Sequence, residues 1–283
     1  MTQEIAHITQ YSHKYDLTGD KSMTEHLMPI LYTLFAWWFS TGVILYLVGM
    51  PRWTFKWTLM SATAVLLLAL LGLVVTRHDT RVTGAYLAFT CALLVWAWQE
   101  VAFLLGYVTG PMRLPCPPDL TLWKRTRLAF QTVVHHELAL LLLGIGVLAA
   151  TWGGANQTGW WTFVVLWVMR QSSKLNLFLG VRNLYESFLP THLKYLHTYF
   201  RRKAMNPLFP VSVIVAGAVA WAIWQRAFAP DSSPFEAASL TFVGILLSLA
   251  VLEHWFLVLP LPSEWLWAWG LKSRLPQTQE KVT

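Results

Sequence analysis

Charged residues are scarce in this sequence. Only 12% of its 283 residues are charged, whereas 55% are hydrophobic and the mean hydropathy is +0.46. A soluble domain of this size carries roughly twice that charged fraction, so composition excludes an ordinary soluble globular protein. Many uncharged stretches reach the length of about 20 residues that crosses a bilayer. The sequence therefore predicts an all-α fold, a polytopic membrane helix bundle.

Cysteines, linkers and catalytic motifs are also few or missing. The two cysteines, Cys91 and Cys116, fall in an apolar run and a polar loop, which excludes a disulfide framework. No low-complexity linker or internal repeat divides the chain, and this favours one membrane domain. The sequence has no P-loop, dinucleotide fingerprint, nucleophile elbow or HExxH zinc motif. These patterns therefore name no reaction, and we favour a binding protein over an enzyme.

Charge, proline and glycine interrupt the apolar sequence and mark the ends of seven predicted spans. We expect residues 1–26 to form a polar periplasmic tail, 27–262 the transmembrane domain and 263–283 a cytoplasmic tail. The first span is the expected insertion signal, because the polar residues before it lack an apolar core. The seven spans are predicted at residues 28–48, 57–75, 82–107, 128–152, 160–180, 207–228 and 235–259.

The distribution of basic residues predicts the orientation. Fourteen of the 21 lysines and arginines lie in the loops after spans one, three and five and in the C-terminal tail. Basic loops remain on the cytoplasmic side, so the N-terminus is predicted outside and the C-terminus inside. The net charge of +7 then indicates contact with membrane lipid headgroups and not with nucleic acid. Tryptophans such as Trp37 and Trp38 are predicted to form interfacial belts.

Ionisable residues at membrane depth are the most informative feature. A charge at mid-bilayer costs at least ~2.5 kcal/mol, so each such residue needs a partner or a purpose. Counting 1.5 Å per residue from the inner end of each span gives the depth of these residues. All lie within about one helical turn of a common level in the inner half of the bilayer. This predicted polar layer comprises Glu100, His135, His136, Glu137, Arg170, Lys174, Asn176, Glu253 and His254.

Three interpretations of the polar layer remain open. In the first, Arg170 and Lys174, which share a helix face, each pair with a glutamate from another helix. In the second, His135, His136 or His254 is an axial ligand of a tetrapyrrole, or the layer binds metal. Adjacent His and Glu residues disfavour a di-metal site, which uses pairs three residues apart. The third is a proton relay, disfavoured because no acid or base continues it through the outer half.

The segment between spans five and six is predicted to be amphipathic near residues 185–203. After Pro190, the side chains Leu193, Leu196 and Phe200 recur at a spacing of three to four residues. This pattern is typical of a helix lying on a membrane surface. The alternative is a docking surface for another protein.

Seven longer segments together resemble a known family and span nearly all of the chain except its tails. They are FAWWFSTGVILYL (35–47), GAYLAFTCALLVWAW (84–98), HHELAL (135–140), LWVMRQSSKLNLFLGVRNL (166–184), FLPTHLKYL (188–196), MNPLFPVSV (205–213) and LEHWFLVLPLP (252–262). On these segments the sequence resembles the PuhE family, the photosynthetic-complex assembly proteins of purple phototrophic bacteria.

The resemblance implies a gene beside that of the reaction-centre H subunit. It implies a multi-pass protein of the cytoplasmic (inner or intracytoplasmic) membrane that assembles the reaction centre and its light-harvesting ring, or adjusts bacteriochlorophyll supply. The implied partners are reaction-centre and light-harvesting subunits or other assembly factors. The candidate cofactors are bacteriochlorophyll or haem, with His135, His136 or His254 as ligand. The alternative is a tetrapyrrole-binding or metal-dependent enzyme of bacteriochlorophyll metabolism. No catalytic residue can be assigned from the family.

Overall fold

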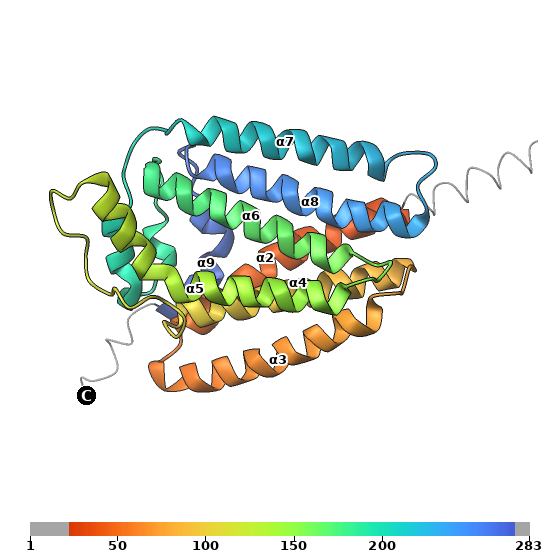
Figure 1. Ribbon diagram of the computed structural model, residues 1–283, viewed down its shortest axis with the longest axis horizontal. Helices are drawn as coiled ribbons and strands as arrows, with labels where there is room; N and C mark the ends of the chain where they lie inside the picture. Colours follow the sequence, from red (N-terminus) through yellow and green to blue (C-terminus); the bar gives the residue numbers. More distant parts are fainter. Residues whose placement is uncertain (1–22, 275–283) are drawn as a thin grey trace, which may run out of the picture.

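The computed structural model describes residues 23–274. In that part of the chain the regular elements are helices, apart from one isolated bridge between Val181 and Arg202. Figure 1 shows the long helices packed side by side in one bundle. The long helices are α2 (Met28–Gly49), α3 (Phe55–Thr76), α4 (Val82–Leu104), α5 (Leu122–Thr151), α6 (Thr158–Leu179), α7 (Leu208–Ala227) and α8 (Pro234–Phe256). The predicted all-α class is confirmed.

Six of these helices are long and apolar enough to cross a membrane, and α6 is the exception. Helix α6 has 22 residues, as many as α2 and α3. Its polar residues, including Arg170 and Lys174, lower its hydropathy, yet it packs against α4, α5 and α8 within the bundle. The multi-pass membrane class is therefore confirmed. The count of seven crossings stays a prediction that depends on α6.

Helices α4 and α8 form the centre of the bundle. Within their spanning windows, 61% and 56% of residues are buried, against 17% for α2, α3 and α7. Phe89 of α4 stacks on Phe242 of α8, with 4.5 Å between ring centroids. Figure 1 places α3 and α7 along opposite edges of the bundle. Their outward faces carry large apolar side chains such as Leu68 and Ile214, which is typical of lipid-facing helices.

Local chemistry explains where several helices begin and end. Helix α5 begins six residues before the predicted limit of 128, because the Thr121 hydroxyl accepts a hydrogen bond from the Lys124 backbone N–H. Helix α6 ends before Gly180, whose φ of 121° suits a residue without a Cβ atom. The remaining limits differ from the predicted ones by a few residues.

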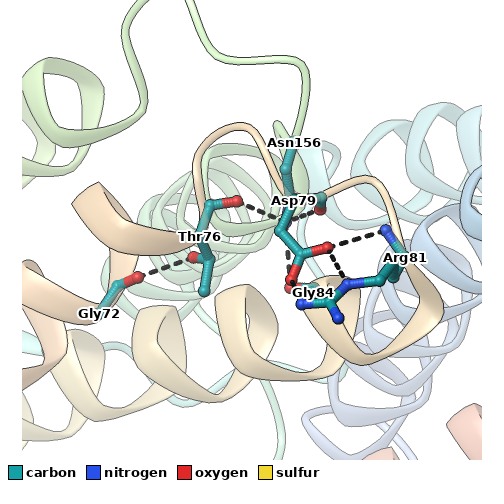
Figure 2. Close-up of polar contacts among 6 residues, drawn as sticks. All are labelled: Gly72, Thr76, Asp79, Arg81, Gly84 and Asn156. Carbon is teal, nitrogen blue, oxygen red and sulfur yellow. Dashed lines mark hydrogen bonds and ion pairs between the residues drawn. The ribbon is translucent and has the colours of Figure 1, made fainter.

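One end of the bundle is held by Asn156, in the loop between α5 and α6. Its side-chain amide donates to the carbonyl oxygens of Thr76, Asp79 and Gly84 at 3.0–3.2 Å, as Figure 2 shows. Beside it, the Arg81 guanidinium donates to the Asp79 carboxylate, and this hydrogen bonding lowers the pKa of Asp79 to about 2. Asn156 therefore ties the α3–α4 turn to the α5–α6 loop.

Part of the expected C-terminal tail belongs to the fold. Residues 263–274 form η5 (Ser263–Trp267), α9 (Ala268–Leu271) and η6 (Lys272–Arg274), which pack against α2. The Trp267 indole N–H donates to the Trp38 carbonyl oxygen at 3.0 Å. The rest of that tail, 275–283, and most of the expected N-terminal tail, 1–22, lie outside the described residues.

The segment predicted as a surface helix is a 3₁₀-helix, η4 (Thr191–Tyr199), and Phe200 lies just beyond its end. Its buried residues Leu193, Leu196 and Tyr199 recur every third position, which matches the three-residue turn of a 3₁₀-helix. Leu193 and Leu196 pack with Phe103 at the end of α4. The apolar face of this segment is therefore turned toward the protein, and not toward a membrane surface as the pattern suggested.

Candidate functional site

A cavity of about 690 Å³ lies among α2, α4, α5, α6 and α8. Most of its walls are apolar or aromatic, with Trp96, Phe103 and Phe178 among them. Pockets of 300–1,000 Å³ with apolar walls and a few polar groups are typical of sites for small molecules and cofactors. Six residues of the predicted polar layer line this cavity: Glu100, His136, Glu137, Arg170, Lys174 and Glu253.

The two cations of α6 form ion pairs with glutamates from two neighbouring helices. The Arg170 guanidinium donates to the Glu100 carboxylate of α4. The Lys174 ammonium donates to the Glu137 carboxylate of α5 at 2.6 Å, and Gln171 donates to the same carboxylate at 2.7 Å. The polar layer is therefore, at least in part, a network of ion pairs that joins three helices.

Glu253 is the third carboxylate of the cavity. In the described part of the chain it has no ion pair within 4.0 Å, and it accepts a hydrogen bond of 2.6 Å from the Trp37 indole N–H. Trp37 was predicted in an interfacial belt, but it lies in the middle of α2 and lines the cavity. When the three glutamates are ionised, the cavity walls hold three carboxylates and the two cations Arg170 and Lys174.

The structure brings only one of the three candidate axial histidines to the cavity. His136 is 1% exposed, and its Nδ1 atom has no hydrogen-bond partner in the described part of the chain. His254 is also buried, but its ring bonds to the Ser172 hydroxyl at 2.9 Å and to the Ala250 carbonyl oxygen at 2.8 Å. His135 is exposed, since adjacent residues point about 100° apart around a helix.

Asn176 lies away from the cavity and connects α6 to the start of α7. Its amide donates to the Ser212 hydroxyl at 3.2 Å, and its side-chain oxygen accepts from Asn206 at 3.0 Å. Asn206 also donates to the Gly180 carbonyl oxygen and accepts from the Leu208 backbone N–H. Asn206 was not among the residues predicted from the sequence, although asparagine is common just before a helix, where its side chain can accept a hydrogen bond from a free backbone N–H.

Arg125 is a second residue that the sequence analysis missed. It was counted only as a cytoplasmic charge, yet it is 7% exposed. Its guanidinium donates to the carbonyl oxygens of Tyr199 and Phe178 and lies over the Phe178 ring. Arg125 therefore connects α5 to the end of η4 and to α6. No sequence signal separated it from the basic residues around it.

The side chains around the cavity are not equally suited to every kind of cofactor. Within residues 23–274 there is no group of three or more His, Cys, Asp or Glu side chains suited to holding a metal ion. A tetrapyrrole needs a single axial imidazole and apolar walls. The cavity has the aromatic walls and one histidine, His136, whose buried Nδ1 atom would have to turn toward the cavity to act as a ligand. The cavity therefore fits a tetrapyrrole better than a metal centre held by several side chains.

Together, these features define a multi-pass helical membrane protein with an ion-paired, mostly apolar cavity. The chain belongs to the family described as "Protein of unknown function (DUF3623)", whose profile matches residues 23–278. It is 38% identical over 255 residues to an uncharacterized 30.4 kDa protein in the puhA 5′ region of Rhodobacter capsulatus, covering 89% of this chain and 93% of that protein. No solved structure matches the chain. The resemblance to the PuhE family is thereby confirmed.

Proposed function

We propose that this protein is an integral membrane factor for assembly of the photosynthetic reaction centre and its light-harvesting complex. The observation that carries this proposal is the relative in the puhA 5′ region, which aligns with this chain over 93% of its own length. The multi-pass helical fold supports a place in the inner or intracytoplasmic membrane, beside the proposed partner subunits. Photosynthetic-complex assembly takes place where those subunits insert.

Deletion of the gene in a phototrophic host tests this function. We expect less mature reaction-centre and light-harvesting complex, measured by membrane absorbance and native gels, with unchanged pigment precursors. Expression of the wild-type chain should restore the complex. A deletion strain with normal complex would contradict the proposal, and an accumulating pigment precursor would favour the enzyme alternative.

The second candidate function is tetrapyrrole binding, by which the protein would adjust bacteriochlorophyll supply or act in bacteriochlorophyll metabolism. It is favoured by His136, a buried ring at the cavity wall with an unpartnered Nδ1 atom. In this role His136 would be the axial ligand of a chlorin magnesium or a haem iron. The apolar walls would exclude water from the bound group.

Purification from a pigment-producing host tests this second function. We expect stoichiometric pigment or haem absorbance in the wild type and its loss in His136→Ala. The matched control is His135→Ala, which removes the neighbouring exposed imidazole. Equal absorbance in both variants, or none in the wild type, would rule out this ligand.

A further inference from the structure

A second pocket, of about 550 Å³, lies at the end of α2 and has mainly polar walls. It is formed by the end of α2, the segment 186–197 and the end of η6. Its lining residues and those of the central cavity have only Leu189 in common. The side chains with charge or titratable groups around it are Arg52, Glu186, His192, Lys194, His197 and Arg274.

The pocket has an excess of positive charge. In the described part of the chain, Arg52, Lys194 and Arg274 form no ion pair within 4.0 Å. The pocket's one acidic residue, Glu186, is paired with Arg202 at 2.6 Å. The walls therefore hold three cations without a counter-ion in the described part of the chain.

Three arginines also surround one histidine. Burial lowers the pKa of His192, and the charges of Arg52, Arg113 and Arg274 lower it further. The hydrogen bond between His192 and the Leu104 carbonyl oxygen acts in the opposite direction and raises this pKa. The positive charges of such a cluster repel one another, and a bound anion would offset this repulsion.

Some hydrogen-bond donors at the pocket are unused. Arg274 donates through Nη1 to the Ser187 carbonyl oxygen at 2.7 Å, but its Nε and Nη2 atoms have no partner in the described part of the chain. The buried Nε2 atom of His197, which donates in one tautomer and accepts in the other, has no partner there either. A buried donor without an acceptor costs about 1–3 kcal/mol. A ligand rich in acceptor oxygens would remove that cost after a small movement of the guanidinium.

We propose that this pocket binds a phosphate group. The planar fork of a guanidinium matches two oxygens of a phosphate, and the lysine adds a compact positive charge. Val48 and Gly49, at the end of a membrane helix, also line the pocket, so the site lies within reach of lipid headgroups. The phosphate belongs to an anionic phospholipid headgroup or to a soluble phosphate compound, which share this chemistry.

Binding experiments on the full chain test the proposal and separate the two sources. The protein is placed in nanodiscs of phosphatidylcholine, with or without phosphatidylglycerol, and retained lipid is measured by native mass spectrometry. Inorganic phosphate is titrated into the same protein by calorimetry. Retained phosphatidylglycerol identifies a headgroup site, whereas saturable binding of inorganic phosphate identifies a soluble ligand. Binding of neither probe overturns the proposal.

Three substitutions locate the binding. Arg274→Gln and Arg52→Gln should each weaken the bound probe at least about tenfold, as expected for lost charge-assisted hydrogen bonds. Arg52 is exposed and has no ion pair among residues 23–274, so this variant keeps the test valid if Arg274→Gln unfolds. The matched control is Lys272→Gln, because Lys272 is exposed on η6 and does not line the pocket. Equal weakening by the control overturns the site.

Discussion

At the residue scale, the charges of the cavity are organised in pairs. Arg170 pairs with Glu100 and Lys174 with Glu137, so each cation of α6 neutralises a carboxylate of another helix. Removing a charge from water is costly, and a buried charge whose partner is deleted is strongly destabilising. The side chains of Glu100 and Glu137 are only 11% and 21% exposed, which makes them dependent on their partners.

Arg170→Met should destabilise the protein because it leaves the Glu100 carboxylate buried without its cation. We expect a loss of about 2 kcal/mol, below the full value for a completely buried pair because Arg170 also faces the cavity. The measurement is reversible unfolding in bicelles. The double variant Glu100→Gln/Arg170→Met should lose less than the sum of its single variants.

The control for this cycle is Arg202→Gln, which breaks an ion pair with Glu186 whose two side chains are both exposed. Exposed pairs contribute about 0–1 kcal/mol, so this change should be nearly neutral. Strict additivity in the Glu100 and Arg170 cycle would show that the two side chains do not stabilise each other.

The depth of charged residues could be predicted from the sequence, but their directions could not. Counting along each span placed Glu100, Glu137 and Arg170 near one level, and in the structure all three line one cavity. The same count could not decide between His135 and His136, because neighbours on a helix differ by about 100° in direction. Side-chain packing determines which of the two histidines is buried. The Phe103 ring lies against the His136 ring, with 4.5 Å between the ring centroids.

At the element scale, the contact of α9 with α2 depends on two glycines. The Gly270 backbone lies against the Gly42 carbonyl oxygen, and the Trp269 ring occupies the space that a Cβ atom at Gly42 would need. Glycine permits such close approach because it lacks a side chain. This contact is the reason why residues 263–274 are part of the fold and not a tail.

Gly42→Ala should therefore displace α9 from α2. We expect lower thermal stability, by roughly 1–3 kcal/mol for an overpacked contact, and faster proteolysis within residues 263–274. The control is Gly217→Ala on α7, where an added Cβ atom meets nothing within 4 Å. Similar behaviour of the two variants would show that the α2–α9 contact is loose.

The 3₁₀-helix η4 should be sensitive to acid. Burial lowers the pKa of both His192 and His197, and the nearby Arg52, Arg113 and Arg274 disfavour protonation of His192 further. Packing of η4 therefore contributes its full stability above the ordinary histidine value of 6.5. As pH falls below that value, the unpacked state takes up protons first, and packing weakens until the lowered pKa is reached.

Hydrogen exchange across residues 191–199, corrected for intrinsic rates, measures this effect between pH 7.5 and 5.5. Exchange should rise in acid for the wild type and change less in His192→Gln/His197→Gln. Glu186 raises the pKa of His197 and so makes η4 less sensitive to acid. In Glu186→Gln, exchange should therefore rise more in acid than it does in the wild type. If exchange in the wild type did not change with pH, the two histidines would not control the packing of η4.

Helix positions were predictable because apolar length and breaker residues mark them, but short elements were not. Helix α7 begins directly after Pro207 and helix α8 begins at Pro234, and proline suits a helix start. The spacing of Leu193 and Leu196 is compatible with both α- and 3₁₀-helix, and in the structure both side chains pack with Phe103. Likewise, nothing local in residues 263–274 indicates a contact with Gly42, more than 200 positions earlier in the chain.

At the scale of the whole molecule, the two ends of the bundle differ. One end is closed by backbone hydrogen bonds to Asn156. The other contains η4, η6 and the cations Arg52, Lys194 and Arg274. Basic residues stay on the cytoplasmic side of a membrane. The predicted orientation therefore places the proposed phosphate pocket inside and Asn156 outside.

Thiol labelling tests both this orientation and the crossing by α6. Cys116, a free thiol in the α4–α5 loop, should react with an impermeant maleimide only after intact spheroplasts are permeabilised. In a background without Cys91 and Cys116, Ala155→Cys and Pro230→Cys lie at exposed positions of the α5–α6 and α7–α8 loops and should react without permeabilisation. The opposite pattern at all three positions would reverse the orientation.

If Pro230→Cys behaved like Cys116 while Ala155→Cys reacted from outside, α6 would not cross. Its ion pairs with Glu100 and Glu137 would then join a helix that enters the bundle and returns, and the protein would cross the membrane six times.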